Sequence, residues 1–129
     1  MNVLLAEDDA ILRGTVREIL EGANYTVFEV GDGEEALEVL KQGHIDLLLL
    51  DLNMPKLSGL EVLDQVESQP PVIIVVSAFE SFNEGELRKA VGPKLIGYLR
   101  KPFQPQKLLD MVADVKAKMP SGASDGAPG

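Results

Sequence analysis

Five short apolar runs recur along the chain and predict five β-strands. They cover residues 3–6, 25–30, 45–50, 72–76 and 95–99. The third and fourth runs are apolar almost throughout, which is typical of strands in a parallel sheet that is covered on both faces. The second run mixes polar with apolar residues, so we expect it at an edge of the sheet.

Segments of helical periodicity separate these runs, and the first two have clear start or stop signals. The first helix is predicted by one apolar stripe that ends near Gly22. Its members are Ile11, Leu12, Val16, Ile19 and Leu20. The second helix is predicted by Asp32 as its N-cap, with Glu35 three positions later, and by Gly43 as a left-handed stop.

Three further helices are predicted by capping signals and prolines. Ser58 with Glu61, and Ser81 with Glu84, match the capping box, in which a hydroxyl and a carboxylate satisfy free amides at a helix start. The fourth helix ends near residue 92, and the fifth opens with Pro105 and stops before residue 120. Strict alternation of five strands and five helices predicts an α/β fold, a (βα)5 doubly wound three-layer sandwich with right-handed crossovers.

Length, composition and charge narrow the class of protein. A chain of 129 residues fits one domain, predicted over residues 1–119, and the Gly/Pro-rich residues 120–129 predict a flexible tail or linker. The net charge of −9 disfavours direct binding of nucleic acid. The sequence has no apolar stretch near the roughly 20 residues of a membrane-spanning helix, no signal-peptide pattern and no cysteine, so we expect a cytoplasmic protein without membrane insertion.

Polar residues follow four of the predicted strands. They are Glu7 and Asp8 after the first strand, Asp51 after the third, Ser77 after the fourth and Lys101 after the fifth. Ligands of open α/β sheets bind outside the carboxyl ends of the strands, so we expect these side chains to converge there. Three clustered carboxylates need a cation, and oxygen ligands without Cys or His favour Mg²⁺. Asp51 is then the candidate nucleophile toward phosphorus, with Lys101 and Ser77 as partners of the phosphoryl oxygens.

Several ordered motifs carry a family resemblance. They are LAEDD at 5–9, DLNMP at 51–55 followed by SG at 58–59, SA at 77–78 and YLRKPF at 98–103. With these motifs the chain resembles the receiver domains of two-component response regulators, the CheY-like superfamily, from residue 1 to about 119. The resemblance implies a flavodoxin-like sheet with strand order 2-1-3-4-5.

The resemblance also implies a role for each matching residue in forming a 4-aspartylphosphate. It implies Asp51 as the phosphoacceptor, Asp8 as a direct Mg²⁺ ligand together with Asp51, Glu7 as a partner through water, and Asn53 as a ligand through its backbone carbonyl. Lys101 becomes the phosphate partner and is joined to Pro102 by a cis peptide bond. Ser77 and Tyr98 become coupled switch residues.

The partners implied by the resemblance are proteins. A sensor histidine kinase or a histidine phosphotransfer protein would donate the phosphoryl group. A downstream protein or effector domain would bind the fourth helix, fifth strand and fifth helix, with a phosphorylation-dependent homodimer as a further possibility. The chain would be a signalling phosphoacceptor that catalyses only its own phosphorylation and dephosphorylation, rather than an enzyme.

Two features depart from the usual family pattern. Ser77 lies 26 positions after Asp51, a short spacing that indicates a trimmed third helix or following loop. Residues 91–95 differ from the Gly-Ala-Asp-like turn that is common before the fifth strand. Both features lie outside the catalytic positions, so they concern the surface offered to partners.

Plainer explanations exist for single residues. The acidic residues 7–9 suit a helix N-terminus, where the dipole favours negative charge, Asp51 suits a cap, and Tyr98 suits packing. Asn53 and Phe79 are the candidates for control of dephosphorylation, because an amide can orient a water and a phenyl ring can exclude one. Phe79 equally suits packing at the start of the fourth helix.

Three other functions compete with a phosphoaccepting receiver. A phosphatase of the haloacid-dehalogenase kind needs a general acid two residues after its nucleophile, where this chain has Asn53. A flavodoxin-like cofactor binder needs a Gly/Ser/Thr-rich loop where this chain has residues 7–9, whose charge would repel a phosphate. The third is a receiver that serves only for docking and is never phosphorylated.

Overall fold

The computed structural model describes residues 1–52, 72–77, 85, 89, 92 and 95–118. Its elements, in chain order, are β1 (Asn2–Ala6), α1 (Ala10–Gly22), β2 (Thr26–Val30), α2 (Gly33–Lys41), β3 (Leu47–Asp51), β4 (Val72–Ser77), β5 (Leu95–Arg100) and α5 (Pro105–Lys118). The predicted third helix and the tail lie outside the described residues. Of the predicted fourth helix only Gly85 and Lys89 are described, and both are helical.

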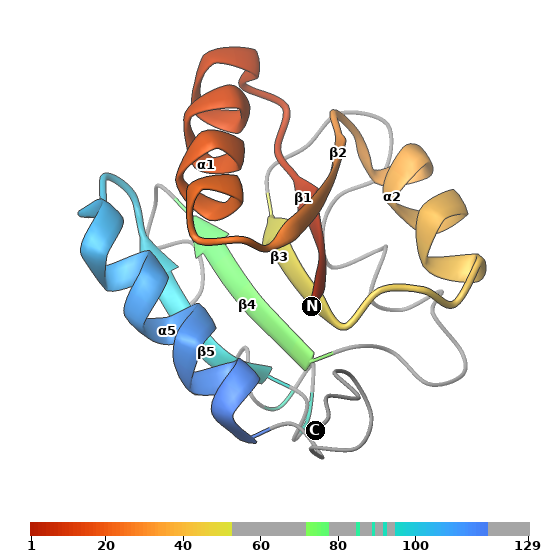
Figure 1. Ribbon diagram of the computed structural model, residues 1–129. Helices are drawn as coiled ribbons and strands as arrows, with labels where there is room; N and C mark the ends of the chain where they lie inside the picture. Colours follow the sequence, from red (N-terminus) through yellow and green to blue (C-terminus); the bar gives the residue numbers. More distant parts are fainter. Residues whose placement is uncertain (53–71, 78–84, 86–88, 90–91, 93–94, 119–129) are drawn as a thin grey trace.

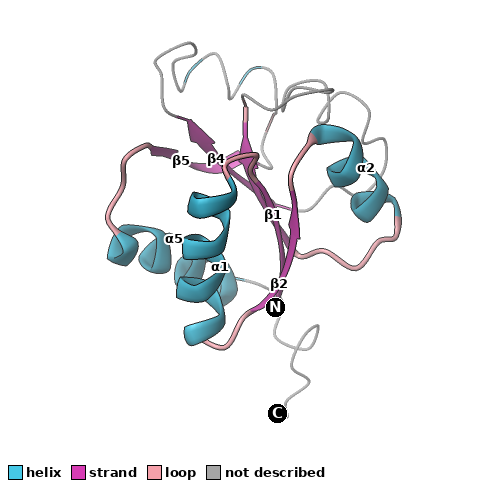
Figure 2. Ribbon diagram, turned by 90° about the horizontal axis from the view of Figure 1, so that it is seen from above, coloured by secondary structure: helices cyan, strands magenta, loops and turns pink. Residues whose placement is uncertain are grey.

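The strands form one parallel sheet in the order β2-β1-β3-β4-β5, which confirms the predicted doubly wound, flavodoxin-like α/β fold. The mixed strand β2 lies at an edge, as its pattern predicted. Helices α1 and α5 cover one face of the sheet and α2 covers the other (Figures 1 and 2). Within the described ranges, no helix is both long and apolar enough to cross a bilayer.

The core consists of two clusters, one on each face of the sheet. The central strand β3 supplies both, because its leucines alternate: Leu48 and Leu50 face the α2 side, and Leu47 and Leu49 face the α1 and α5 side. All four are almost fully buried. Burial of each leucine contributes roughly 1.5–3 kcal/mol, so β3 is firmly anchored in the sheet, and it ends at Asp51.

Helix α1 shows one error in the predicted apolar stripe. Val16 and Leu20 are buried, but Ile11 is 83% exposed. At 100° per residue, Ile11 lies roughly 125° around the helix from the centre of the stripe formed by the other four residues. The prediction was therefore wrong for Ile11, which belongs to the solvent side of the first turn.

Helix α5 approaches β5 closely at a glycine. A Cβ atom on Gly97 would overlap the Cε of Met111, so any larger residue at this strand position would require the end of the Met111 side chain to move. The register between β4 and β5 is also irregular, since Ile73 pairs with Leu95 whereas Ile74 pairs with Gly97. The intervening Ile96 is 41% exposed.

Three strands extend one residue further at their carboxyl ends than the sequence predicted, namely β3, β4 and β5. Asp51 is the last residue of β3, opposite Val76 of β4, and Ser77 is the last residue of β4, opposite Arg100 of β5. Asp51 and Ser77 were expected just after their strands. Their backbones therefore belong to the sheet, which fixes their positions at its carboxyl edge.

Candidate functional site

The carboxyl edge of the sheet brings together side chains from three distant segments. The Nζ atom of Lys101, after β5, lies 2.7 Å from Oε1 of Glu7, after β1. The same Nζ atom lies 3.2 Å from Oδ2 of Asp51. The side chains of Glu7 and Asp51 are each 4% exposed, and that of Lys101 is 17% exposed. One ammonium is thus shared by two buried carboxylates.

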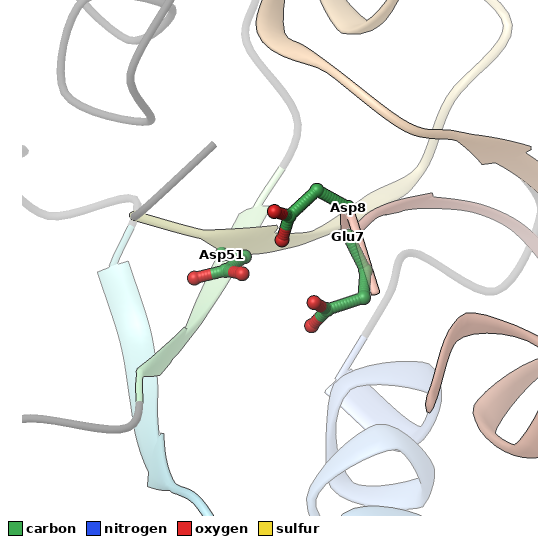
Figure 3. A group of neighbouring side chains, drawn as sticks. All are labelled: Glu7, Asp8 and Asp51. Atoms are coloured by element: carbon green, nitrogen blue, oxygen red, sulfur yellow. The ribbon is translucent and has the colours of Figure 1, made fainter. Parts of the chain in front are cut away.

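Asp8 adds a third carboxylate to this cluster. One carboxylate oxygen from each of Glu7, Asp8 and Asp51 lies within 4.8 Å of the others, and Figure 3 shows the three side chains gathered between β1 and β3. Opposite ligands of an Mg²⁺ ion are about 4 Å apart, twice the usual Mg–O distance. The donors are all oxygens, and three carboxylates with one ammonium leave two negative charges. Donor type and charge fit a small divalent cation, and a spacing within 4.8 Å is close to the separation of its ligands.

Burial changes the ionisation of Glu7. Removal of its carboxyl group from water raises its pKa to about 6, although the hydrogen bonds from Lys101 and from the backbone of Asp9 oppose this shift. The nearby charge of Asp51 acts in the same direction as burial. The ionised cluster therefore costs free energy at neutral pH, which a bound cation would offset.

The pKa of Lys101 is governed by its acidic neighbours more than by burial. Burial alone lowers the pKa of its ammonium, but the hydrogen bond to Glu7 and the attraction of Asp51 outweigh burial. The pKa is therefore raised overall, and Lys101 is charged at neutral pH.

The acidic residues between β1 and α1 serve two purposes, capping of the helix and formation of the carboxylate cluster. Asp9 is the N-cap of α1, since its Oδ1 accepts hydrogen bonds from the backbone N–H groups of Ile11 at 3.0 Å and Leu12 at 3.1 Å. Oε2 of Glu7 accepts a hydrogen bond from the N–H of Asp9 at 3.1 Å. The helix-start explanation of this segment thus applies to Asp9, whereas Glu7 and Asp8 belong to the cluster.

The other predicted site residues are placed in part. Tyr98 is half-buried and packs against the core cluster on the α2 face. The Lys101–Pro102 peptide bond is cis, as the resemblance implies. Asn53 and Phe79 lie outside the described residues. For Ser77 the structure gives the strand position but no side-chain surroundings.

One residue beside the cluster was missed in the sequence. Arg13, one turn into α1, donates from Nη1 to the backbone carbonyl of Glu7 at 2.8 Å. The acceptor is a main-chain atom, which no side-chain motif reveals. The available signal was an arginine one turn into the helix that follows the acidic segment.

A doubly wound sheet with these acids and a lysine at its carboxyl edge has the architecture of a receiver domain. The chain belongs to the family described as "Response regulator receiver domain", whose pattern its sequence matches over residues 3–113. It is therefore a receiver domain of two-component signalling, as the motifs indicated.

Some relatives of this chain have about its own length, and others are about twice as long. It is 32% identical to the chemotaxis protein CheY of Halobacterium salinarum, over 88% of this chain and 94% of that protein. It is 31% identical to the aerobic respiration control protein ArcA and 37% identical to the transcriptional regulatory protein CpxR, both of Escherichia coli. Each match covers 83% of this chain but only 44% of ArcA and 45% of CpxR, so the chain spans less than half of these two regulators.

Solved receiver structures share the fold. The receiver domain of AraT from Geobacillus stearothermophilus is 34% identical, with a TM-score of 0.77, over 91% of this chain and 93% of that one. Chemotaxis protein CheY4 of Vibrio cholerae is 32% identical, with a TM-score of 0.74, over 88% of this chain and 97% of that one. The likeness thus covers the sheet and its helices together.

Proposed function

We propose that this receiver domain accepts a phosphoryl group on Asp51 in an Mg²⁺-dependent reaction. The donor is the phosphohistidine of a sensor histidine kinase or a histidine phosphotransfer protein. The observation that carries the proposal is the placement of the Asp51 carboxylate, which is buried at a strand end, 3.2 Å from Lys101 and beside two further acids. A carboxylate that only capped a helix or turn would not require a neighbouring lysine and two further acids.

The chemistry follows from the chain's own groups. A carboxylate oxygen of Asp51 attacks phosphorus, so that an O–P bond forms while the N–P bond of the phosphohistidine breaks and the imidazole leaves with that electron pair. The Lys101 ammonium then balances negative charge on a phosphoryl oxygen. Ser77, at the end of the neighbouring strand, is the expected hydrogen-bond donor to another oxygen.

The acids divide the work of holding the ion. Asp8 and Asp51 are the proposed direct ligands, together with the backbone carbonyl of Asn53. Both oxygens of Glu7 are already engaged, one by Lys101 and one by the N–H of Asp9, which supports a contact through water for Glu7. When bound, Mg²⁺ neutralises charge on the phosphoryl oxygens and on the carboxylates.

The reaction serves as a switch for protein contacts. We propose that Ser77 moves toward the phosphoryl group and that Tyr98 turns from a more exposed to a more buried rotamer in response. The altered surface is the fourth helix with β5 and α5, which binds a downstream protein, an effector domain or a second copy of the chain. ArcA and CpxR extend well beyond the region matched by this chain, which supports an effector domain as one output. The proposed location of the protein is the cytoplasm.

The lifetime of the acyl phosphate is controlled by the groups beside the line of water attack. We propose Asn53 and Phe79 for this role, the first to orient a water and the second to exclude one. The domain then catalyses only its own phosphorylation and dephosphorylation. Its output depends on how long Asp51 remains modified.

The test is to incubate the protein with acetyl phosphate and MgCl2 and to weigh the intact chain. We expect the wild type to gain the mass of one phosphoryl group and Asp51→Asn to gain none, because an amide of the same shape lacks the nucleophilic carboxylate. Asp114→Asn, which alters an exposed carboxylate of α5, is the matched control and should be modified like the wild type. Phosphorylation of Asp51→Asn at the wild-type rate would refute the assignment.

A further inference from the structure

The peptide bond that joins Glu7 to Asp8 links two of the three clustered acids, and hydrogen bonds hold the backbone of Glu7 at both its N–H and its carbonyl. The N–H of Glu7 donates to the carbonyl of Val30 at the end of β2, at 3.1 Å. The carbonyl of Glu7 accepts a hydrogen bond from Nη1 of Arg13 at 2.8 Å. The backbone of Glu7 is therefore fixed on one side by the sheet and on the other by a guanidinium group.

Arg13 is itself fixed in place from two directions. Its Nε atom lies 3.2 Å from Oε1 of Glu29 on β2, and the two side chains are only 24% and 29% exposed. A Cβ atom on Gly31 would lie 3.1 Å from Nη1 of Arg13, so the glycine leaves space for the guanidinium. The rigid, planar fork of arginine contacts two acceptors at once, which an ammonium cannot do in the same way.

The two acids that share this peptide bond differ in what orients them. Glu7 is held by its own side-chain contacts with Lys101 and the Asp9 N–H. Asp8 is exposed, and within the part of the chain that the structure describes its carboxylate makes no hydrogen bond or ion pair. The region that the Asp8 carboxylate can reach is therefore set by its backbone, which fixes the direction of the Cα–Cβ bond, and hence by the peptide bond whose oxygen Arg13 holds.

We infer that Arg13 is a positioning residue for the Mg²⁺ site: its hydrogen bond to the Glu7 carbonyl aims the Asp8 carboxylate at the cluster and thereby raises the affinity for the ion. This inference rests on the proposed function, because it assigns Asp8 as an Mg²⁺ ligand. Among its described contacts, Arg13 reaches no carboxylate of the cluster. It acts through the backbone, as outer-shell groups of metal sites do.

The plainer explanation is that Arg13 only ties α1 to β2. Arg17, one turn further along α1, provides the comparison, because its Nη1 lies 2.5 Å from Oε2 of the same Glu29 and its Nε lies 3.2 Å from Glu21. Arg17 makes the same link between helix and strand but has no contact with the acidic segment among its described interactions. The two arginines therefore separate a tie between elements from an effect on the site.

The experiment compares Arg13→Met with Arg17→Met in the full chain. MgCl2 is titrated into metal-free protein, binding is followed by the ¹H–¹⁵N NMR signals of residues 7–9, and thermal melting is recorded for each variant. Both variants should lose stability with the Glu29 contact, but only Arg13→Met should bind Mg²⁺ more weakly, by about 10-fold. Wild-type affinity in Arg13→Met would overturn the inference.

A second variant and a rate measurement control for misfolding of Arg13→Met. Arg13→Lys keeps a cation beside Glu29 but cannot contact both acceptors as the fork does, so we expect it to fold and still to bind Mg²⁺ several-fold more weakly. The slow phosphorylation of both Arg13 variants by acetyl phosphate should recover at saturating MgCl2, which a general loss of structure would not allow. Rates that stay low at saturation would contradict action through the ion.

The outcomes distinguish a failure of the role of Arg13 from a failure of the proposed phosphoacceptor function. A wild type that binds Mg²⁺ and is phosphorylated, with Arg13 variants that behave identically, overturns only the role of Arg13. A wild type that neither binds Mg²⁺ nor gains a phosphoryl group overturns the proposed function and this inference with it.

Discussion

Replacement of Lys101 by methionine removes the ammonium that contacts both Glu7 and Asp51 while keeping a side chain of similar length. In metal-free buffer we expect this variant to become less stable than the wild type as the pH rises above about 6. Glu7 is the group responsible, since its carboxyl is buried and loses the hydrogen bond that opposes its upward pKa shift. A buried charge that loses its partner is costly.

The magnitude follows from the pKa of Glu7. In the wild type the folded-state pKa is about 6 against an ordinary value of 4.5, so the free energy of unfolding falls as the pH rises between these values. Each unit is worth about 1.4 kcal/mol, which makes the total fall roughly 2 kcal/mol. It is complete just above pH 6, because Glu7 is then ionised in both states.

In Lys101→Met the folded-state pKa of Glu7 is higher still, so the fall continues. In the limit where folded Glu7 stays protonated at about pH 7.5, the total cost is roughly 4 kcal/mol. The variant should therefore lose up to about 2 kcal/mol relative to the wild type between about pH 5 and pH 7.5. The two proteins should differ much less in this respect at the lower pH, where Glu7 is largely protonated in both.

The assay is urea unfolding followed by circular dichroism across this pH range in the presence of a chelator. Lys107→Met, which alters an exposed lysine of α5, is the matched control and should run parallel to the wild type. Excess MgCl2 should narrow the difference at the higher pH, because a dication among the carboxylates replaces the missing ammonium. Parallel stability curves for Lys101→Met and the wild type would show that the ammonium of Lys101 does not offset the buried charge of Glu7.

Two further predictions concern the ion and the lifetime of the phosphoryl group. Asp8→Ala should weaken Mg²⁺ binding by more than the roughly 10-fold typical of an outer-shell loss. It should also raise the melting temperature in metal-free buffer, since it removes one of three repelling carboxylates. An unchanged melting temperature would argue against that repulsion. Phe79→Ala should shorten the acyl-phosphate lifetime several-fold, about 1 kcal/mol in the barrier, as measured by the decay of phosphoprotein mass after removal of the donor. An unchanged lifetime in the folded variant would leave Phe79 as a packing residue.

The elements and the edge where chemistry gathers were predictable because both depend on features that sequence carries directly, whereas the order of the strands was implied by the family resemblance. Alternating apolar runs and helix caps define the elements, and the crossover rules leave few arrangements of them. Once the order is known, Glu7, Asp51 and Lys101 are expected at one edge of the sheet, since each stands at or just beyond the carboxyl end of a parallel strand. The structure adds the distances, which depend on side-chain rotamers that sequence alone does not determine.

The errors in the prediction have local causes. Ile11 was assigned to the buried stripe because it is apolar and adjacent to Leu12, but its angle on the helix places it in solvent. Asp51 was expected just beyond its strand because a charged residue after an apolar run resembles a terminator. It is instead paired within the sheet, since backbone hydrogen bonding in a strand does not depend on the polarity of the side chain.

Arg13 shows a different limit of sequence reasoning. Its contact is with a backbone carbonyl, and every residue has one, so no pattern of side chains marks the acceptor. The acids of the cluster were identified because their own chemistry requires carboxylates at strand ends. A residue that orients them requires only a donor at a suitable position on the adjacent helix, and Arg13 and Arg17 are equally plausible donors until the fold shows which one reaches Glu7. Residues that do the chemistry are therefore easier to identify from sequence than residues that position it, and the comparison of these two arginines tests whether the second group matters in this protein.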